Sequence, residues 1–272
     1  MPEEKRFVTM LGGWFDDSGR RDGEFPISVV GGFVAHPTQW VGFNHRWKEI
    51  LDKYDVEIHH QNRWSNGAKP FDKETWKFYS QRQDYINELL NLICSVSAVS
   101  IAAAVPHHRM DAQFPNWRKY TTPFGFAAQL VFSAAIDKAR ESFPDARIAY
   151  VFESGSEGYP EVERSFQECH SKPHIRDEFG LISLTDMDKR KDMRLQAADI
   201  LAYEVYKLYQ KGDNPNSTTF KARYPLRVIS NKMPGVWTTP SDEMVHYSAQ
   251  LRDLGEALDE LIALRKKGGL PA

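Results

Sequence analysis

The stretch GGWFDDSGRRDGEFPISVVGGFVAH, residues 12–36, decides how the chain begins to fold. It contains two short apolar runs rich in β-branched and aromatic residues, separated by glycines and aspartates that are typical of turns. Together with the residues just before it, the stretch predicts an antiparallel hairpin with strands at Phe7–Phe15 and Ile27–Ala35. Gly31 and Gly32 lie inside the second strand without dinucleotide-binding spacing, so they predict either a bulge or a close backbone approach.

Strands and helices alternate along the rest of the chain. Apolar and β-branched runs predict further strands within 96–105, 146–155 and 181–184. Helical spacing of apolar residues predicts helices within 37–54, 72–94, 122–143 and 194–209, and another from Tyr159 onward. This order favours a single α/β domain over 1–272, with a mixed β-sheet flanked by helices. An extra C-terminal helix is expected at about 239–267, because Thr239-Pro240 can begin a helix that carries one apolar stripe.

The composition limits the function classes. With 41% hydrophobic residues and a net charge of −2, the chain can form a core but has no overall positive charge to bind a polyanion. Cys94 and Cys169 form no C-x-x-C pair, so a disulfide framework or zinc finger is not expected. No signal sequence or membrane-spanning run is present, which predicts a cytoplasmic protein without a membrane partner.

Three carboxylates lie where charge is expensive to bury. Asp16 and Glu153 are predicted to end apolar strands, and Asp199 lies inside an apolar helix. An ionised side chain there costs several kcal/mol unless a cation compensates it. The partner could be a lysine or arginine, such as Lys191 or Arg194, or a divalent ion that several carboxylates share. Oxygen ligands without a thiolate favour Mg²⁺ or Mn²⁺ as that ion.

Two motifs carry a resemblance to a known family. FDDSG, followed by FPISVVGGFVA, and the later LQAADILAYEVYK resemble the signatures of the DUF3800 family, a strand ending in D-E-S-G and a helix carrying L-Q-x-A-D. The match runs roughly from Phe7 to Tyr209. The family is placed among ribonuclease H-like folds, so the resemblance implies that fold here. Asp17 stands where the family more often has Glu, which leaves Asp16 as the matching metal-binding residue.

The resemblance also implies a set of site residues. Asp16 and Asp199 are expected to bind metal, and Glu153 takes the place of an acidic residue that ends a strand. The further residues that it implies are Ser18, Glu57, His59 and Gln196. Glu57 and His59 belong to an acidic and histidine element after the first helix. His59 and His60 could equally be loop histidines that only form hydrogen bonds.

The expected chemistry follows from the carboxylates. Two cations about 3.5–4 Å apart, bridged by a strand-end Asp, activate a water and stabilise the leaving oxygen of a phosphodiester. Asp16 would be the bridge, and Glu153 and Asp199 would complete the metal shells with Glu57 or Asp17. A nearby lysine would stabilise the developing charge. Lys189 and Lys191 are the candidates, with Lys191 taken as the catalytic one.

A basic region begins at the same place. Between Met187 and Lys232 there are ten Lys or Arg against five Asp or Glu, with aromatic residues interleaved. This pattern is typical of nucleic-acid binding, and the expected contact residues are Lys189, Arg190, Arg194 and Lys207. A solvated helix face with its tyrosines packed on the core would look the same.

The combined prediction is a Mg²⁺- or Mn²⁺-dependent nuclease acting on DNA or RNA. One alternative is a catalytically inactive ribonuclease H-like module with a nucleic-acid-binding or regulatory role. Another is a two-carboxylate glycoside hydrolase. The chain lacks the local motifs of serine esterases, P-loop proteins and zincins. His107 and His108 are interpreted as surface or loop histidines. The C-terminal helix could either pack on the core or form a homo-oligomer, and its single apolar stripe does not decide between the two.

Overall fold

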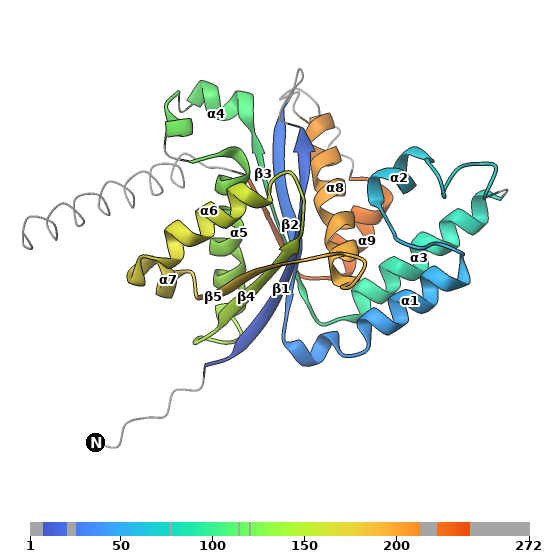
Figure 1. The fold of residues 1–272 in the computed structure, drawn as a ribbon, viewed down its shortest axis with the longest axis horizontal. Coiled ribbons are helices and arrows are strands. Elements are labelled where there is room, and N and C mark those ends of the chain that lie inside the picture. Colours follow the sequence, from blue (N-terminus) through green and yellow to red (C-terminus); the bar gives the residue numbers. More distant parts are fainter. Residues whose placement is uncertain are drawn as a thin grey trace, which may run out of the picture.

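The computed structural model describes residues 8–20, 26–76, 78–113, 115–119, 121–212 and 222–239. Its centre is a six-stranded sheet in the order β5-β4-β1-β2-β3-β6 (Figure 1). The strands are β1 (Met10–Arg20), β2 (Ile27–Ala35), β3 (Val99–Pro106), β4 (Arg147–Glu153), β5 (Leu181–Met187) and β6 (Gly235–Thr238). The α-helices are α1 (Phe43–Lys53), α2 (Gln61–Asn66), α3 (Tyr79–Ser95), α4 (His107–Gln113), α5 (Pro123–Arg140), α6 (Tyr159–His170), α7 (Pro173–Glu178), α8 (Arg194–Gly212) and α9 (Tyr224–Lys232), with short 3-10 turns η1 (Pro37–Trp40) and η2 (Trp117–Lys119).

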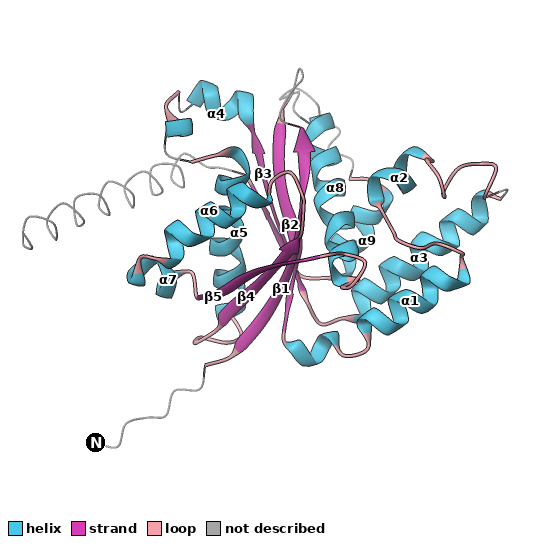
Figure 2. Ribbon diagram, viewed as in Figure 1, coloured by secondary structure: helices cyan, strands magenta, loops and turns pink. Residues whose placement is uncertain are grey.

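The sheet is mixed, as the sequence predicts. β2 runs antiparallel to both of its neighbours, β1 and β3, whereas the β1–β4, β4–β5 and β3–β6 pairs are parallel. Helices cover both faces: α4 to α7 lie on one side, and α1, α2, α3, α8 and α9 lie on the other (Figures 1 and 2). The prediction of an α/β fold with a mixed sheet flanked by helices is therefore confirmed.

Each face of the sheet has its own core. Side chains alternate along β1, so Trp14 packs on the α8 side whereas Phe15 packs on the α5 side. The α5 side is apolar, and Phe132 contacts Tyr150 edge-to-face with ring centroids 4.8 Å apart. The α8 side contains an equally buried aromatic group, centred on Trp47 and Tyr85, but also most of the buried charged residues.

The predicted hairpin is present, but its first strand is longer than expected. β1 pairs with β4 only as far as Phe15, opposite Phe152, and then continues to Arg20 paired with β2 alone. The prediction that Asp16 ends its strand is therefore wrong. Asp16 lies inside β1, at the point where the parallel neighbour β4 stops. The prediction for β4 is confirmed, because Glu153 is its last residue.

Gly31 allows a close helix approach rather than a bulge. Gly31 and Gly32 pair in uninterrupted register with β1 and β3. A Cβ atom added to Gly31 would lie 3.0 Å from the Cα of Ala202, so a side chain here would collide with the α8 backbone. Gly31 therefore allows α8 to rest directly on the strand that pairs with Asp16.

Two predicted helices have different boundaries in the structure. The 37–54 segment is divided into η1 and α1 at Gly42, whose φ of 75° is left-handed and suits glycine. The 72–94 helix begins only at Tyr79, because the Asp72 carboxylate accepts hydrogen bonds from the backbone N–H groups of Glu74 and Thr75 and so fixes a turn. The prediction at Thr122 is confirmed, since its hydroxyl caps α5.

Other elements carry too little sequence signal to be predicted. The short helices α2, α4 and α7 have six or seven residues each, and α9 and β6 were also not predicted. His107 is not a loop residue but starts α4 and is buried, hydrogen-bonded to Ser28 over 3.0 Å. The C-terminal helix expected at about 239–267 lies outside the described residues, apart from residue 239 itself. In the part of the chain that the structure describes, no helix combines the length and apolarity needed to cross a membrane.

Candidate active site

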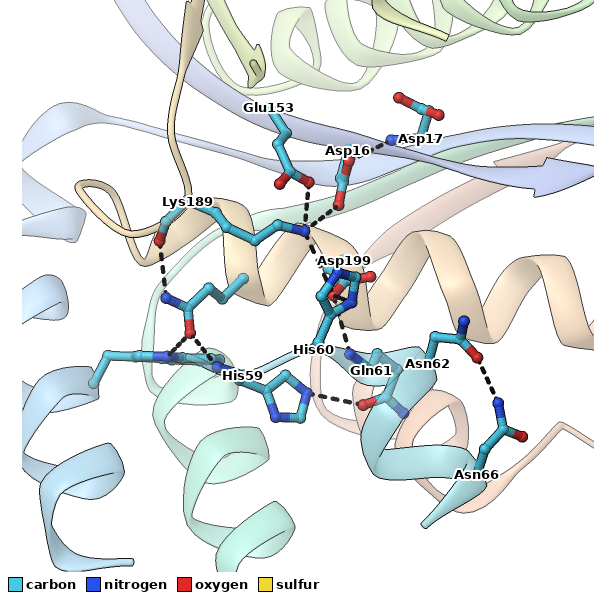
Figure 3. Close-up of polar contacts among 12 residues, drawn as sticks. Asp16, Asp17, His59, His60, Gln61, Asn62, Asn66, Glu153, Lys189 and Asp199 are labelled. Carbon is cyan, nitrogen blue, oxygen red and sulfur yellow. Dashed lines mark hydrogen bonds and ion pairs between the residues drawn. The ribbon is translucent and has the colours of Figure 1, made fainter. Parts of the chain in front are cut away.

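Three carboxylates from distant parts of the chain lie together on the α8 side of the sheet (Figure 3). Asp16 comes from β1 and Glu153 from the end of the adjacent parallel strand β4. Asp199 comes from α8, which packs across β1 and β2. Alternation along the strand gives Asp16 the same face as Trp14, and this face is the one that α8 covers. The predicted convergence of Asp16, Glu153 and Asp199 is therefore observed.

The ammonium of Lys189 lies at the centre of these carboxylates. Its Nζ is 2.5 Å from Glu153 Oε2, 3.7 Å from Asp16 Oδ2 and 3.9 Å from Asp199 Oδ2. The Lys189 side chain is only 8% exposed, in the loop between β5 and α8. We call this group the carboxylate cluster: Asp16, Glu153, Asp199 and Lys189.

Burial and the neighbouring charges shift the pKa values of the cluster in opposite directions. Burial raises the pKa of Asp16 well above its ordinary value, although Lys189 acts to lower it. Burial also acts to raise the pKa of Asp199, but His60 and Lys189 outweigh it and lower this pKa to about 2. For Lys189, the attraction of the carboxylates exceeds the effect of burial and raises the pKa above its ordinary value. Of these two carboxylates, Asp16 is thus the one that binds a proton more readily.

The start of α2 holds Asp199 in place. The backbone N–H of Gln61 donates a hydrogen bond to Asp199 Oδ2 over 3.0 Å. His60 Nδ1 lies 3.1 Å from the same oxygen. Asp199 thus receives contacts from α2 on one side and from Lys189 on the other, which fixes the direction of its carboxylate (Figure 3).

Gln196 connects the cluster to its surroundings. It lies one turn before Asp199 on α8, and its side-chain N–H donates to the backbone carbonyl of Lys189 over 2.8 Å. Its Oε1 accepts hydrogen bonds from the Trp47 indole at 3.0 Å and from the backbone of His59 at 2.9 Å. Gln196 therefore fixes the backbone of Lys189 and the segment that carries His60.

A buried polar network extends from this segment to α9. Gln61 donates from its side-chain amide to Glu204 Oε1 over 2.6 Å, and Arg223 Nε lies 3.4 Å from Glu204 Oε2. The Gln61 Oε1 atom must then accept from His59 Nε2, 3.0 Å away, and His59 Nδ1 lies 3.0 Å from the Tyr85 hydroxyl. Burial lowers the pKa of His59 to about 4, so the ring is neutral near pH 7 and its Nδ1 accepts a hydrogen bond from the Tyr85 hydroxyl.

The loop that carries Lys189 is held at a second point. Asp192 is buried and accepts hydrogen bonds from the Trp14 indole at 3.0 Å and from the Arg194 guanidinium at 2.6 Å and 2.7 Å. The guanidinium also lies over the Trp14 ring, 3.9 Å from its centroid. Arg194 was predicted to contact nucleic acid, but its charge is used to anchor this loop.

Four other predicted residues lie outside the cluster. Asp17 points to the α6 side, where its Oδ2 accepts a hydrogen bond from the backbone of Gly158 over 3.2 Å (Figure 3). Adjacent strand residues face opposite ways, so Asp17 cannot join Asp16. Glu57 is exposed in the segment before α2, and Ser18 is half-buried further along β1. Lys191 is exposed, so the buried lysine of the site is Lys189 and not Lys191.

The basic region is divided between packing and surface. Lys189 is buried in the cluster, and Lys207 lies over the rings of Tyr203 and Tyr206. Both tyrosines are buried in the α8-side core, which agrees with the alternative interpretation of a packed tyrosine stripe. Arg190, next to Lys189 in the loop, is exposed.

The residues of the cluster fit a divalent cation by charge and by ligand type. Three carboxylates face one ammonium, a formal excess of two negative charges in a buried place when all are ionised. All the candidate ligand atoms are carboxylate oxygens, which suit Mg²⁺ or Mn²⁺. Among the described residues, no three His, Cys, Asp or Glu side chains are already arranged as a metal site. In the cluster, Lys189 lies between the carboxylates in the position of a shared cation.

Comparisons with family models and with curated proteins give no match. No family model matches the chain, and no curated protein matches it significantly. The resemblance to the DUF3800 family therefore stays a prediction that rests on the motifs around Asp16 and Asp199.

Proposed function

We propose that the protein is a Mg²⁺- or Mn²⁺-dependent phosphodiester hydrolase that acts on nucleic acid. The observation that carries the proposal is the convergence of Asp16, Glu153 and Asp199, from two strands and a helix, around one buried lysine. Burying this many carboxylates together is costly unless a cation joins them. A functional site is the simplest reason to retain such an arrangement.

The three carboxylates are the residues that would hold the metal. When bound, a divalent ion supplies a water of lowered pKa and a positive charge for the leaving oxygen. His60 and the Gln61 backbone orient Asp199, and Gln196 holds the loop of Lys189. The Lys189 ammonium can pair with a phosphate oxygen at this site.

The sheet also supports the ribonuclease H-like fold that the resemblance implies. It is mixed, and helices cover both faces. The carboxylates lie at the carboxyl end of the parallel pair β1–β4, where ligands commonly bind in open α/β sheets. Arg190 and Lys191 are exposed next to Lys189, and they are the surface cations that we expect to contact a nucleic-acid backbone.

The direct test is metal-dependent cleavage. The purified protein is incubated with single-stranded and duplex DNA and RNA in the presence of Mn²⁺, beside Asp16→Asn and Asp199→Asn. Each variant removes one carboxylate charge with little change of shape, so we expect a loss of at least about 100-fold in the cleavage rate, the scale of a removed electrostatic contact. Mn²⁺ should also raise the melting temperature of the wild type and not of the variants.

Asp17→Asn is the matched control, because this carboxylate is adjacent in sequence but lies on the other side of the sheet. It should retain most of the activity. Equal cleavage by the wild type, Asp16→Asn and Asp199→Asn would show that the activity is a contaminant.

A second candidate is supported by the short contact between Lys189 and Glu153. If Lys189 closes the cluster permanently, the protein is an inactive module of the same fold that binds nucleic acid or regulates. No cleavage under any condition, together with no effect of Mn²⁺ on the melting temperature, would favour this candidate. The glycoside hydrolase alternative stays a prediction from the sequence.

A further inference from the structure

Lys189 occupies the place that a shared metal ion would need. Its Nζ lies within 3.9 Å of one oxygen from each of Asp16, Glu153 and Asp199. Mg²⁺ bound by the same oxygens would lie about 2.0–2.1 Å from them. The ammonium cannot remain at the centre beside such an ion, because the two cations would repel each other across a short distance in a buried place.

The structure fixes the backbone of Lys189 by contacts that do not involve its ammonium. Gln196 holds the Lys189 carbonyl, and backbone hydrogen bonds to Asp188 from Lys191 and Asp192 close the turn that follows it. Withdrawal of the ammonium therefore does not require the loop to move. A lysine side chain is a flexible four-carbon stem, so its charge can leave the cluster by rotation of the stem alone.

We propose that Lys189 is an internal competitor of the divalent ion, and that a phosphodiester substrate relieves this competition by pairing with the ammonium. This inference rests on the proposed function and adds to it the way in which the site is loaded. Metal and nucleic acid then bind with positive coupling, since each favours the state in which Lys189 has left the carboxylates. The protein alone binds metal weakly.

The test measures metal affinity rather than cleavage. Mn²⁺ is titrated by calorimetry into the wild type, Lys189→Met and Lys48→Met. Lys48→Met is the control, because it removes the same charge from an exposed pair with Asp52. We expect Lys189→Met to bind Mn²⁺ at least tenfold more tightly than the wild type, and Lys48→Met to match the wild type. Equal or weaker binding by Lys189→Met, or no binding by any of the three, overturns the inference.

The second arm measures the coupling. The titration is repeated with a saturating single-stranded phosphorothioate oligonucleotide that resists hydrolysis. The wild type should gain at least fivefold in Mn²⁺ affinity, and Lys189→Met should lose this gain. An equal gain in both proteins overturns the inference. If circular dichroism shows that Lys189→Met is unfolded, Lys189→Gln replaces it, because an amide can still donate to Glu153.

The two proposals fail separately. Tighter binding by Lys189→Met without any cleavage by the wild type rejects the nuclease but leaves the competition standing. Cleavage that depends on Asp16 and Asp199, with equal Mn²⁺ affinity in the wild type and Lys189→Met, supports the nuclease and rejects the competition.

Discussion

The two faces of the sheet are equally buried but differ in chemistry. On the α5 side, the helix contributes a continuous set of apolar side chains, and aromatic rings such as Phe132, Tyr150 and Phe166 pack against one another. On the α8 side, a helix in the same kind of position buries Asp199 and Glu204. Each buried charge there has a partner, whereas the α5-side core needs none. Packing alone could have been achieved as on the α5 side, and the proposed metal site gives a reason for the buried charges of α8.

The comparison predicts that the α8 side makes stability depend on pH. His59 is buried neutral there, and burial lowers its pKa from 6.5 to about 4. The unfolded chain therefore binds a proton more readily than the folded one, so stability is complete above about pH 6.5 and falls as the pH drops toward 4. For this difference in pKa, the free energy of unfolding decreases by about 3 kcal/mol. Urea unfolding at a series of pH values measures it.

Two variants assign this loss to His59. His59→Gln cannot titrate and should flatten the profile between pH 6.5 and 4, although His107, whose pKa burial also lowers to about 4, keeps part of the slope. Phe132→Leu, on the α5 side, should lower stability equally at every pH and leave the profile parallel to that of the wild type. A His59→Gln profile as steep as that of the wild type would contradict the assignment.

A smaller effect is expected where α8 touches the sheet. Gly31→Val places a branched side chain against the α8 backbone, where even a Cβ would lie 3.0 Å from the Ala202 Cα. We expect a loss of about 1–3 kcal/mol, typical of overpacking. Asp199 lies one turn before Ala202, so Mn²⁺ affinity should fall as well. Gly31→Ala should show both effects more weakly. Unchanged Mn²⁺ affinity in both variants would show that the contact between Gly31 and α8 does not position Asp199.

The sequence was sufficient to predict the three carboxylates and the type of fold. Strand patterns and an apolar helix locate Asp16, Glu153 and Asp199, and the α/β alternation implies a sheet on which they can meet. The opposite direction of Asp17 was also within reach, because side chains alternate along a strand. The burial of Lys189 rather than Lys191 could not be predicted, because loop residues follow no periodic pattern that shows which of two nearby lysines is buried.

Other parts of the site had no local signal at all. His60 and Gln61 reach Asp199 from α2, a helix of six residues, too short to show helical periodicity. Glu204 is polar at a position of α8 that the apolar pattern would place in the core, and this mismatch is the one signal that could have identified it. Its partners, Gln61 and Arg223, are far away in sequence, and only the tertiary structure brings them together.

The smallest expected effect concerns Asp16 itself. Burial raises the pKa of Asp16 in the folded protein, so the folded state holds this proton more tightly than the unfolded chain does. Stability therefore falls as the pH rises from the ordinary carboxyl pKa through the raised one. Asp16→Asn does not titrate, so at pH 8 it should be more stable than the wild type by about 0.5–2 kcal/mol, the usual gain for one favourable substitution. The gain should shrink at pH 4.

Asp52→Asn is the control for this gain, because Asp52 lies in an exposed ion pair with Lys48 and should change stability by less than about 0.5 kcal/mol at either pH. Denaturant unfolding of the three proteins at pH 4 and pH 8 is the measurement. If Asp16→Asn is the less stable protein at pH 8, the attraction between Asp16 and Lys189 exceeds the cost of burial. The cluster would then be a stabilising ion-pair network like any other, and the contrast between the two faces would no longer indicate that stability is given up for a site.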